Sequence, residues 1–139
     1  MIILDTNVIS EPMKVRADPA VAAWLDRQAA ETLYLTAINL SEMLLGVELL
    51  PEGRRKRGMT TAMQELLAGL FGTRFLAFDR EAAAAYAFLA ARAAANGMTM
   101  GVGDGQIAAI AAVHGFTVAT RDTAPFLAAG VPVINPWES

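Results

Sequence analysis

The chain has 139 residues, 55% of them hydrophobic, and its 11 Lys and Arg against 14 Asp and Glu give a formal net charge of -3. This size and apolar content suit one domain with one core, expected over residues 1–139, and they exclude a disordered chain. With no cysteine, disulfides and thiolate metal sites are excluded, and charged residues around the alanine-rich runs favour packed helices over membrane spans.

Short apolar runs alternate with helical patterns in the first half of the chain. In chain order, the expected elements are a strand at 2–4, a helix from Pro19, a strand at 33–35, a helix over 38–50 and a helix over 60–70. Asn39 or Ser41 is expected to cap the second of these helices, which Pro51 ends. The basic segment GRRKRG leads into the third helix.

The same alternation continues in the second half. In chain order, the expected elements are a strand at 75–78, an alanine-rich helix that Asp79 caps and Gly97 ends, a loop at 97–103, a helix from Asp104 to Gly115, and strands at 116–119 and 131–134. Such alternation predicts an α/β fold, with a parallel sheet and helices on both of its faces. Ligands of such folds gather beyond the carboxyl ends of the strands.

Four carboxylates lie next to the ends of these elements: Asp5, Glu42, Asp104 and Asp122. Asp5 directly follows the first strand, and Asp122 comes shortly after the strand FTVA. Glu42 lies one turn into its helix, where Met43 and Leu44 are expected to be buried. Taken singly, each acid could be an ordinary cap, turn or surface residue. Together they could form one acidic pocket, and like charges gathered in one cleft need a cation.

Four segments of the chain carry a resemblance: ILDTNVISE, AINLSEMLLGV, GDGQIAAIAAVHGFTVATRD and PVINPW. In order and spacing they resemble the PIN-domain ribonucleases, specifically the VapC-like toxins and among them the FitB-type branch. The resemblance covers nearly the whole chain. It implies a PIN domain, a three-layer α/β/α sandwich with a central parallel sheet, which cuts RNA with Mg²⁺ or Mn²⁺ as the toxin of a type II toxin–antitoxin system.

The partners that the resemblance implies are an RNA substrate, a cognate antitoxin, a second copy of the chain in a homodimer, and a toxin–antitoxin hetero-oligomer. The alanine-rich helix over 80–96 is a candidate for the dimer interface. No basic segment followed by a cleavable apolar one opens the chain, so a secretion signal is not recognisable. The absence of cysteine suits a reducing cytoplasm, which is the expected location.

The acids of the family carry over onto this chain one by one. The resemblance places the first acid, in a DTN or DTS motif, on Asp5, the helical Glu on Glu42, and the third acid on Asp104. Many relatives continue TRN with an Asp three residues on, whereas this chain reads TRDTAPF, with Asp122 at the Asn position and Pro125 at the later Asp position. Asp122 is therefore expected to supply the fourth carboxylate.

The expected chemistry is metal-dependent hydrolysis of RNA. Carboxylate oxygens are the ligands that Mg²⁺ or Mn²⁺ prefers, and a zinc site is disfavoured. Asp5 and Asp104 are expected to bind the ion, with Glu42 and Asp122 as further ligands. The ion would lower the pKa of a water and stabilise charge on the phosphate, and one ion or two remain open. The residues expected to orient these groups are Thr6, Asn7 and Thr120.

Basic residues would have to bind the RNA backbone, because the net charge is negative. The segment GRRKRG supplies four candidates: Arg54, Arg55, Lys56 and Arg57. A solvated helix start explains this run equally well. Arg121, next to Asp122, is a further candidate, as are Lys14 and Arg16 in the loop after the first strand. Recognition is expected to rely on the shape of the RNA and on its single-stranded segments.

Two readings from other functional classes remain. Asp5 could be the nucleophile of a phosphatase similar to the haloacid dehalogenases, but those enzymes need a second Asp two residues on, where this chain has Asn7. Alternatively, the chain could be a catalytically silent module that binds an antitoxin or a nucleic acid without metal. Metal-dependent cleavage of RNA separates all three readings.

Overall fold

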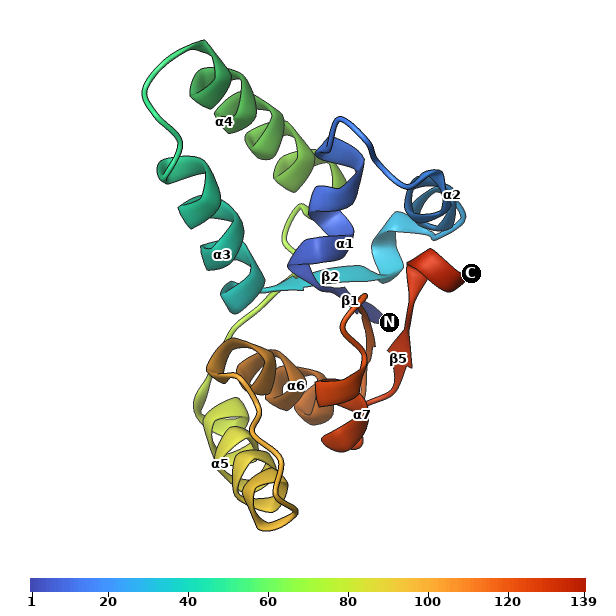
Figure 1. Ribbon diagram of the computed structural model, residues 1–139, viewed down its shortest axis with the longest axis vertical. Helices are drawn as coiled ribbons and strands as arrows, with labels where there is room; N and C mark the ends of the chain where they lie inside the picture. The colour runs from blue at the N-terminus through green and yellow to red at the C-terminus, as the bar shows by residue number, and fades with distance from the viewer.

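The computed structural model describes residues 1–139 and contains one five-stranded sheet (Figure 1). Its strands are β1 (Ile2–Leu4), β2 (Leu33–Thr36), β3 (Phe75–Leu76), β4 (Thr117–Ala119) and β5 (Val133–Ile134). All neighbouring strands are parallel, in the order β3-β2-β1-β4-β5. β1 is central, since Ile2 is paired with Leu33 of β2 on one side and with Thr117 of β4 on the other. The predicted parallel α/β sheet is confirmed.

Helices connect the strands. They are α1 (Thr6–Ser10), α2 (Pro19–Asp26), α3 (Ala37–Glu48), α4 (Arg54–Leu66), α5 (Arg80–Ala95), α6 (Val102–His114) and α7 (Ala124–Ala128). A π-helical turn at Leu67–Phe71 continues α4, and 3-10 turns lie at Glu11–Met13, Ala30–Thr32 and Pro136–Glu138. None of the helices is long and apolar enough to cross a lipid bilayer.

The sheet separates two hydrophobic clusters, one on each face. Neighbouring residues of a strand point to opposite faces, and Ile3 and Leu4 of β1 are both fully buried. Leu4 packs with side chains of α1 to α4, such as Met43, whereas Ile3 packs with side chains of α5 to α7, such as Phe126. Figure 1 shows these two groups of helices on opposite sides of the sheet. The predicted three-layer arrangement is confirmed, and burial on both faces explains why the strands are mostly apolar.

The strand order places a crevice between the ends of β1 and β4. The chain passes from β1 outward through β2 and β3, and then returns to add β4 and β5 on the other side of β1. Such a reversal of direction leaves an opening beyond the carboxyl ends of the two inner strands. Asp5 directly follows β1 and Thr120 directly follows β4, and the Asp5 N–H donates to the Ala119 carbonyl at 2.9 Å. The fold thus brings together the two segments in which the sequence has acidic residues.

Most of the elements lie where the pattern of the sequence predicts them, within a few residues. α2 begins at Pro19, and Asp79 caps α5 by accepting a hydrogen bond from the Ala82 N–H at 3.0 Å. Gly115 ends α6 in the left-handed conformation, at φ 68°, which glycine adopts without steric penalty. The short helices α1 and α7 were not predicted, because five residues are too few to show a helical period.

The predicted cap of α3 and the predicted start of α4 are wrong. Thr36 caps α3, not Asn39 or Ser41, because Asn39 is the third residue of the helix. α4 begins at Arg54, not Thr60, since Arg and Lys are good helix formers and the basic run forms the first turn.

Leu44 is 45% exposed rather than buried, because Met43 and Val47 already supply the face of α3 that packs on the core. The start of α6 was also misplaced. This helix begins at Val102, so Asp104 lies within its first turn instead of opening it.

Candidate active site

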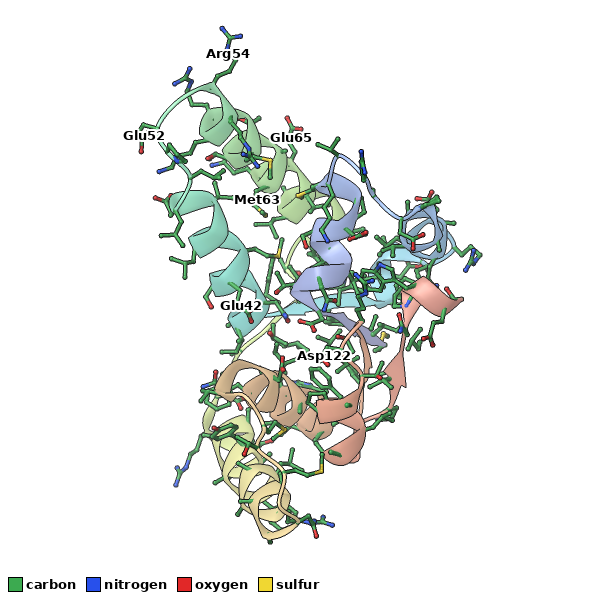
Figure 2. The ribbon with its side chains drawn as sticks, in the orientation of Figure 1. Glu42, Glu52, Arg54, Met63, Glu65 and Asp122 are labelled. Atoms are coloured by element: carbon green, nitrogen blue, oxygen red, sulfur yellow. The ribbon has the colours of Figure 1, made fainter.

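One cavity of about 330 Å³ contains all four predicted carboxylates. Its lining is entirely polar and consists of Asp5, Thr6, Asn7, Ser10, Glu42, Asp104 and Asp122. The four acids come from four separate places: the end of β1, the second turn of α3, the first turn of α6 and the segment after β4. Figure 2 shows Glu42 near the N-terminal end of α3 and Asp122 in the segment before α7. We call this hollow, at the crevice between β1 and β4, the acidic cavity.

Asp5 is the most buried of the four acids, with 7% of its surface exposed. Its Oδ1 accepts the Thr6 N–H at 2.8 Å and the Asn39 amide at 3.3 Å, and its Oδ2 accepts the Thr120 hydroxyl at 2.8 Å. Burial raises the pKa of Asp5, with a further increase from the charge of Asp122, and these hydrogen bonds lower it in part. The three hydrogen bonds to Asp5 also fix the orientation of both of its carboxylate oxygens.

Glu42 and Asp104 are affected by the same electrostatic field. Desolvation at the wall of the cavity raises the pKa of Glu42, and the charges of Asp5 and Asp104 raise it further. Desolvation likewise raises the pKa of Asp104, followed by the charges of Asp5 and Asp122. Each of these carboxylates thus disfavours ionisation of the others, and a cation in the cavity would remove that repulsion.

Thr120 and Asn7 connect the loop after β4 to the site. The Thr120 hydroxyl donates to Asp5 and accepts the Asp122 N–H at 3.1 Å, so it ties two of the acids together. Asn7 Oδ1 accepts the Arg121 N–H at 3.4 Å instead of contacting an acid through its amide group. Thr6 bonds Asp5 through its main-chain N–H, while its hydroxyl accepts a hydrogen bond from Asn39 at 3.4 Å.

Sequence reasoning missed two polar residues of the site. Ser10 lines the acidic cavity from the end of α1, which was not predicted to be a helix. Asn39 was considered only as a cap, yet it is fully buried and bonds Asp5. A signal was present, because Thr36 and Asn39 have the spacing of a capping box and Glu42 lies a further three residues along the same helical face.

The basic candidates lie at different distances from the acidic cavity. Arg54 is at the outer end of α4, away from Glu42 (Figure 2). Lys56 is held by the α3–α4 connection, because its ammonium donates to Glu52 at 2.8 Å and to the Glu48 carbonyl at 3.0 Å. Arg57 and Arg16 do not line the acidic cavity, whose lining residues are Asp5, Thr6, Asn7, Ser10, Glu42, Asp104 and Asp122.

Arg55 and Lys14 both line a second cavity of about 470 Å³, which shares Thr6, Ser10 and Glu42 with the acidic cavity. Its other walls are largely apolar and belong to the end of α1 and its 3-10 turn, α3 and α4. The guanidinium of Arg121 lies 5.2 Å from the centre of the Trp137 ring, a cation–π contact that restrains it beside the loop of Asp122.

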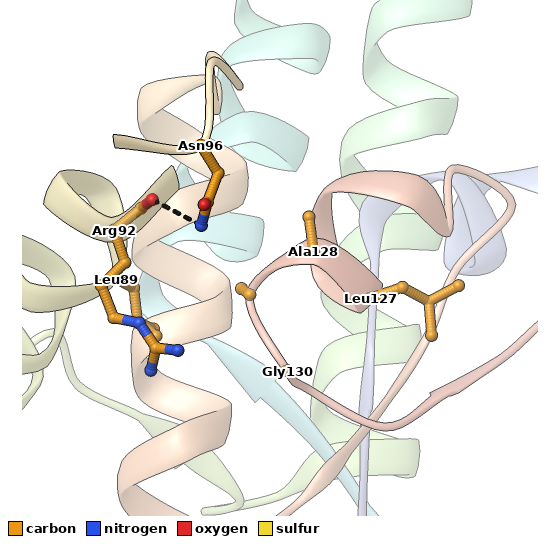
Figure 3. A pocket seen from close by; sticks show the side chains of 7 residues that line it. Leu89, Arg92, Asn96, Leu127, Ala128 and Gly130 are labelled. Carbon is orange, nitrogen blue, oxygen red and sulfur yellow. Dashed lines mark hydrogen bonds between the residues drawn. The ribbon is translucent and has the colours of Figure 1, made fainter. Parts of the chain in front are cut away.

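A third cavity of about 140 Å³ lies between α5 and α7 and holds none of the candidate residues (Figure 3). Its polar groups are Arg92 and Asn96, and Asn96 already donates to the Arg92 carbonyl at 3.0 Å. It contains no carboxylate and no nucleophilic side chain. The acidic cavity is therefore the candidate site for chemistry.

The donors of the acidic cavity suit a hard divalent ion, because all of them are oxygen atoms of carboxylates and hydroxyls together with one amide. No three His, Cys, Asp or Glu side chains are already gathered closely enough to hold an ion. Asp5, Glu42 and Asp104 nevertheless share one cavity in which their charges disfavour one another's ionisation, and the cavity has room for an ion with water. These residues therefore fit a hydrated divalent ion.

Comparison with known proteins agrees with the resemblance that the sequence motifs carry. The PIN domain family model matches residues 2–131. VapC ribonuclease Y4jK of Sinorhizobium fredii is 51% identical over 139 residues, and toxin FitB of Neisseria gonorrhoeae is 46% identical over 137 residues; each match covers 99% of both chains. The crystal structure of FitAcB from Neisseria gonorrhoeae matches the whole of both chains with a TM-score of 0.96 and 45% identity. By sequence and by fold, the chain belongs to the PIN-domain family.

Proposed function

We propose that this protein is a metal-dependent endoribonuclease and the toxin of a type II toxin–antitoxin system. The observation that carries the proposal is the acidic cavity, in which four carboxylates from four separate elements line one wholly polar hollow. Isolated caps or surface acids would not converge in this way. The names of the relatives, a ribonuclease and a toxin, support the same function.

Asp5 and Asp104 bind the ion in this proposal, and Glu42 and Asp122 complete the set of oxygen ligands. Mg²⁺ or Mn²⁺ would supply Lewis acidity, which lowers the pKa of a water and offsets charge on the phosphate. Thr120 and the Thr6 N–H hold the Asp5 carboxylate in one orientation. Hydrolysis adds water across the P–O3′ bond and leaves a 3′-hydroxyl and a 5′-phosphate.

The RNA strand would lie along the second cavity, next to the acids. Arg55 lines that cavity and is the best placed of the basic residues to bind a phosphate flanking the cleaved bond, while Lys14, which also lines it, is already paired with Glu11 at 2.9 Å. Lys56 is less available, because Glu52 and the α3–α4 connection already hold it. A single-stranded segment fits this arrangement better than a duplex, since its bases can be splayed onto apolar side chains.

An antitoxin is the second proposed partner, and a cationic side chain inserted among the four carboxylates would inhibit the enzyme. The toxin would act in the cytoplasm, as a homodimer and within a toxin–antitoxin hetero-oligomer. Expression of the chain with and without the protein of its neighbouring gene tests this part. Co-purification and loss of cleavage are expected, and a partner-free chain that is fully active in both preparations would contradict it.

Cleavage of a panel of RNAs tests the proposed activity. The wild-type protein is expected to cut at least one RNA with Mg²⁺ or Mn²⁺ and none with EDTA, whereas Asp5→Asn and Asp104→Asn are expected to be inactive and folded. Asp26→Asn is the matched control, because Asp26 is an exposed acid of α2 outside the cavity. Activity only on a small phosphate ester would favour the phosphatase reading, and binding without any cleavage would favour the silent module.

A further inference from the structure

One buried amide joins the start of α3 to the end of β1. Asn39 has no exposed surface, and its Nδ2 donates to Asp5 Oδ1 at 3.3 Å and to the Thr6 hydroxyl at 3.4 Å. Its Oδ1 accepts the Thr36 N–H at 3.3 Å and the Thr36 hydroxyl at 2.6 Å. Because a main-chain N–H can only donate, the oxygen of the amide must face Thr36 and its NH₂ group must face Asp5.

Asn39 also belongs to the capping box of α3. Its main-chain N–H donates to the Thr36 hydroxyl at 3.1 Å, and the two residues satisfy each other's free groups at the helix start. Glu42 lies three residues further along the same face of the helix. Asn39 therefore bonds the Asp5 carboxylate and belongs to the start of the same helix that carries Glu42.

Helix capping accounts for only half of the hydrogen bonds of this side chain. The Oδ1 atom completes the capping box, but the Nδ2 group contributes nothing to the helix and bonds only Asp5 and Thr6. Two other groups donate to the Asp5 carboxylate: the Thr6 N–H bonds the same oxygen as Asn39, and the Thr120 hydroxyl, which follows β4, bonds the other oxygen. With Asn39 on one oxygen and Thr120 on the other, the carboxylate cannot rotate without breaking a buried hydrogen bond.

We infer that Asn39 is a positioning residue, which holds the Asp5 carboxylate toward the acidic cavity and sets its placement relative to Glu42. The inference rests on the proposed binding of a divalent ion by that cavity. Partners that orient metal ligands typically account for a 10- to 100-fold effect on metal affinity. Asn39 itself makes no contact with the ion or with RNA in this arrangement.

The test is Mn²⁺ binding to the metal-free protein, followed by electron paramagnetic resonance. Asn39→Leu removes the donor to Asp5 in a side chain of similar size, and Asn39→Ser removes it in a smaller one that cannot reach Asp5. Thr36→Val is the matched control, because it removes the cap hydroxyl from the same helix start but leaves Asn39 Nδ2 and the Thr36 N–H in place. Circular dichroism establishes that each variant is folded at the temperature of the assay.

Both Asn39 variants are expected to raise the Mn²⁺ dissociation constant about 10- to 100-fold, and Thr36→Val is expected to leave it near the wild-type value despite a lower melting temperature. Wild-type Mn²⁺ affinity in a folded Asn39 variant would overturn the inference, and so would an equal loss of affinity in Thr36→Val. In both cases the proposed function would still stand, provided that the unsubstituted protein binds Mn²⁺ and cuts RNA. A wild-type protein that binds no Mn²⁺ and cuts no RNA would instead overturn the proposed function and this inference with it.

Discussion

Glu42 destabilises the metal-free protein through its charge. Its pKa in the folded state is raised, so the fold loses stability as the pH rises through that pKa and the group ionises beside Asp5 and Asp104. Glu42→Gln is expected to increase the free energy of unfolding at neutral pH, by less than about 1 kcal/mol because solvent screens an exposed group. Thermal melts in EDTA measure this. The control is Glu65→Gln, an exposed acid of α4 for which no change is expected, and a lower melting temperature of Glu42→Gln would contradict the prediction.

Thr120 contributes to stability through one fully buried hydroxyl. Thr120→Val keeps the shape of the side chain but leaves Asp5 Oδ2 without a donor and the Asp122 N–H without an acceptor. The expected loss is about 1–3 kcal/mol, the usual effect of an unsatisfied buried polar group. Urea unfolding measures it, and Thr120→Ser, which retains the hydroxyl, should lose much less. Equal stability of the Val and Ser variants would mean that the hydrogen bonds contribute nothing.

Three of the acids could be predicted from the pattern of the sequence, because Asp5 and Asp122 come after apolar strands and Asp104 lies in the first turn of a helix, and the α/β fold brings such positions to one edge of the sheet. Asp5 and Asp122 follow strands, whereas Glu42 depended on the family motif, since an acid within a helix usually faces solvent. Asn39 could not be assigned to the site in this way. The capping-box spacing with Thr36 places Asn39 at the start of the helix, but its role in the site depends on contact with Asp5, 34 residues earlier in the chain, which that local spacing does not predict.

At the scale of elements, the contact between α5 and α6 places Asp104. Gly105 is buried against Tyr86, and a Cβ atom added there would lie 2.7 Å from the Tyr86 Cε2 atom. Gly105→Ala is therefore expected to push α6 away from α5, displace the neighbouring Asp104 and lower stability by about 1–3 kcal/mol with loss of RNA cleavage. Gly58→Ala is the matched control, because nothing lies within 4 Å of a Cβ at that position of α4. The control should gain about 0.5–1 kcal/mol, and unimpaired cleavage by Gly105→Ala would contradict the prediction.

The strands of the fold could be predicted from the sequence, but the buried faces of its helices could not. Strands such as Ile2–Leu4 are short, apolar and bounded by turn signals, so their number and type follow from the pattern of the sequence. The burial of α3 did not follow, because its run of apolar residues continues around the helix and only contact with the core distinguishes Met43 from Leu44. Leu45 on the exposed side of this helix and Leu49 at its C-terminal cap are also exposed, and helical period alone would not separate them from the core.

At the scale of the whole molecule, the acidic cavity couples folding to metal and to pH. Burial and mutual repulsion raise the pKa values of Asp5, Glu42 and Asp104, so in the metal-free protein these groups lower stability as the pH rises above about 4. An ion binds the ionised carboxylates, and protons compete with it. Mn²⁺ at 100 times its dissociation constant is expected to stabilise the fold by about 2.7 kcal/mol. The increase in melting temperature should be larger near pH 7 than near pH 5, and it should disappear in Asp5→Asn. Thermal melts with Mn²⁺ and with EDTA at both pH values measure it, and an equal shift in Asp5→Asn would show that the ion acts elsewhere on the protein.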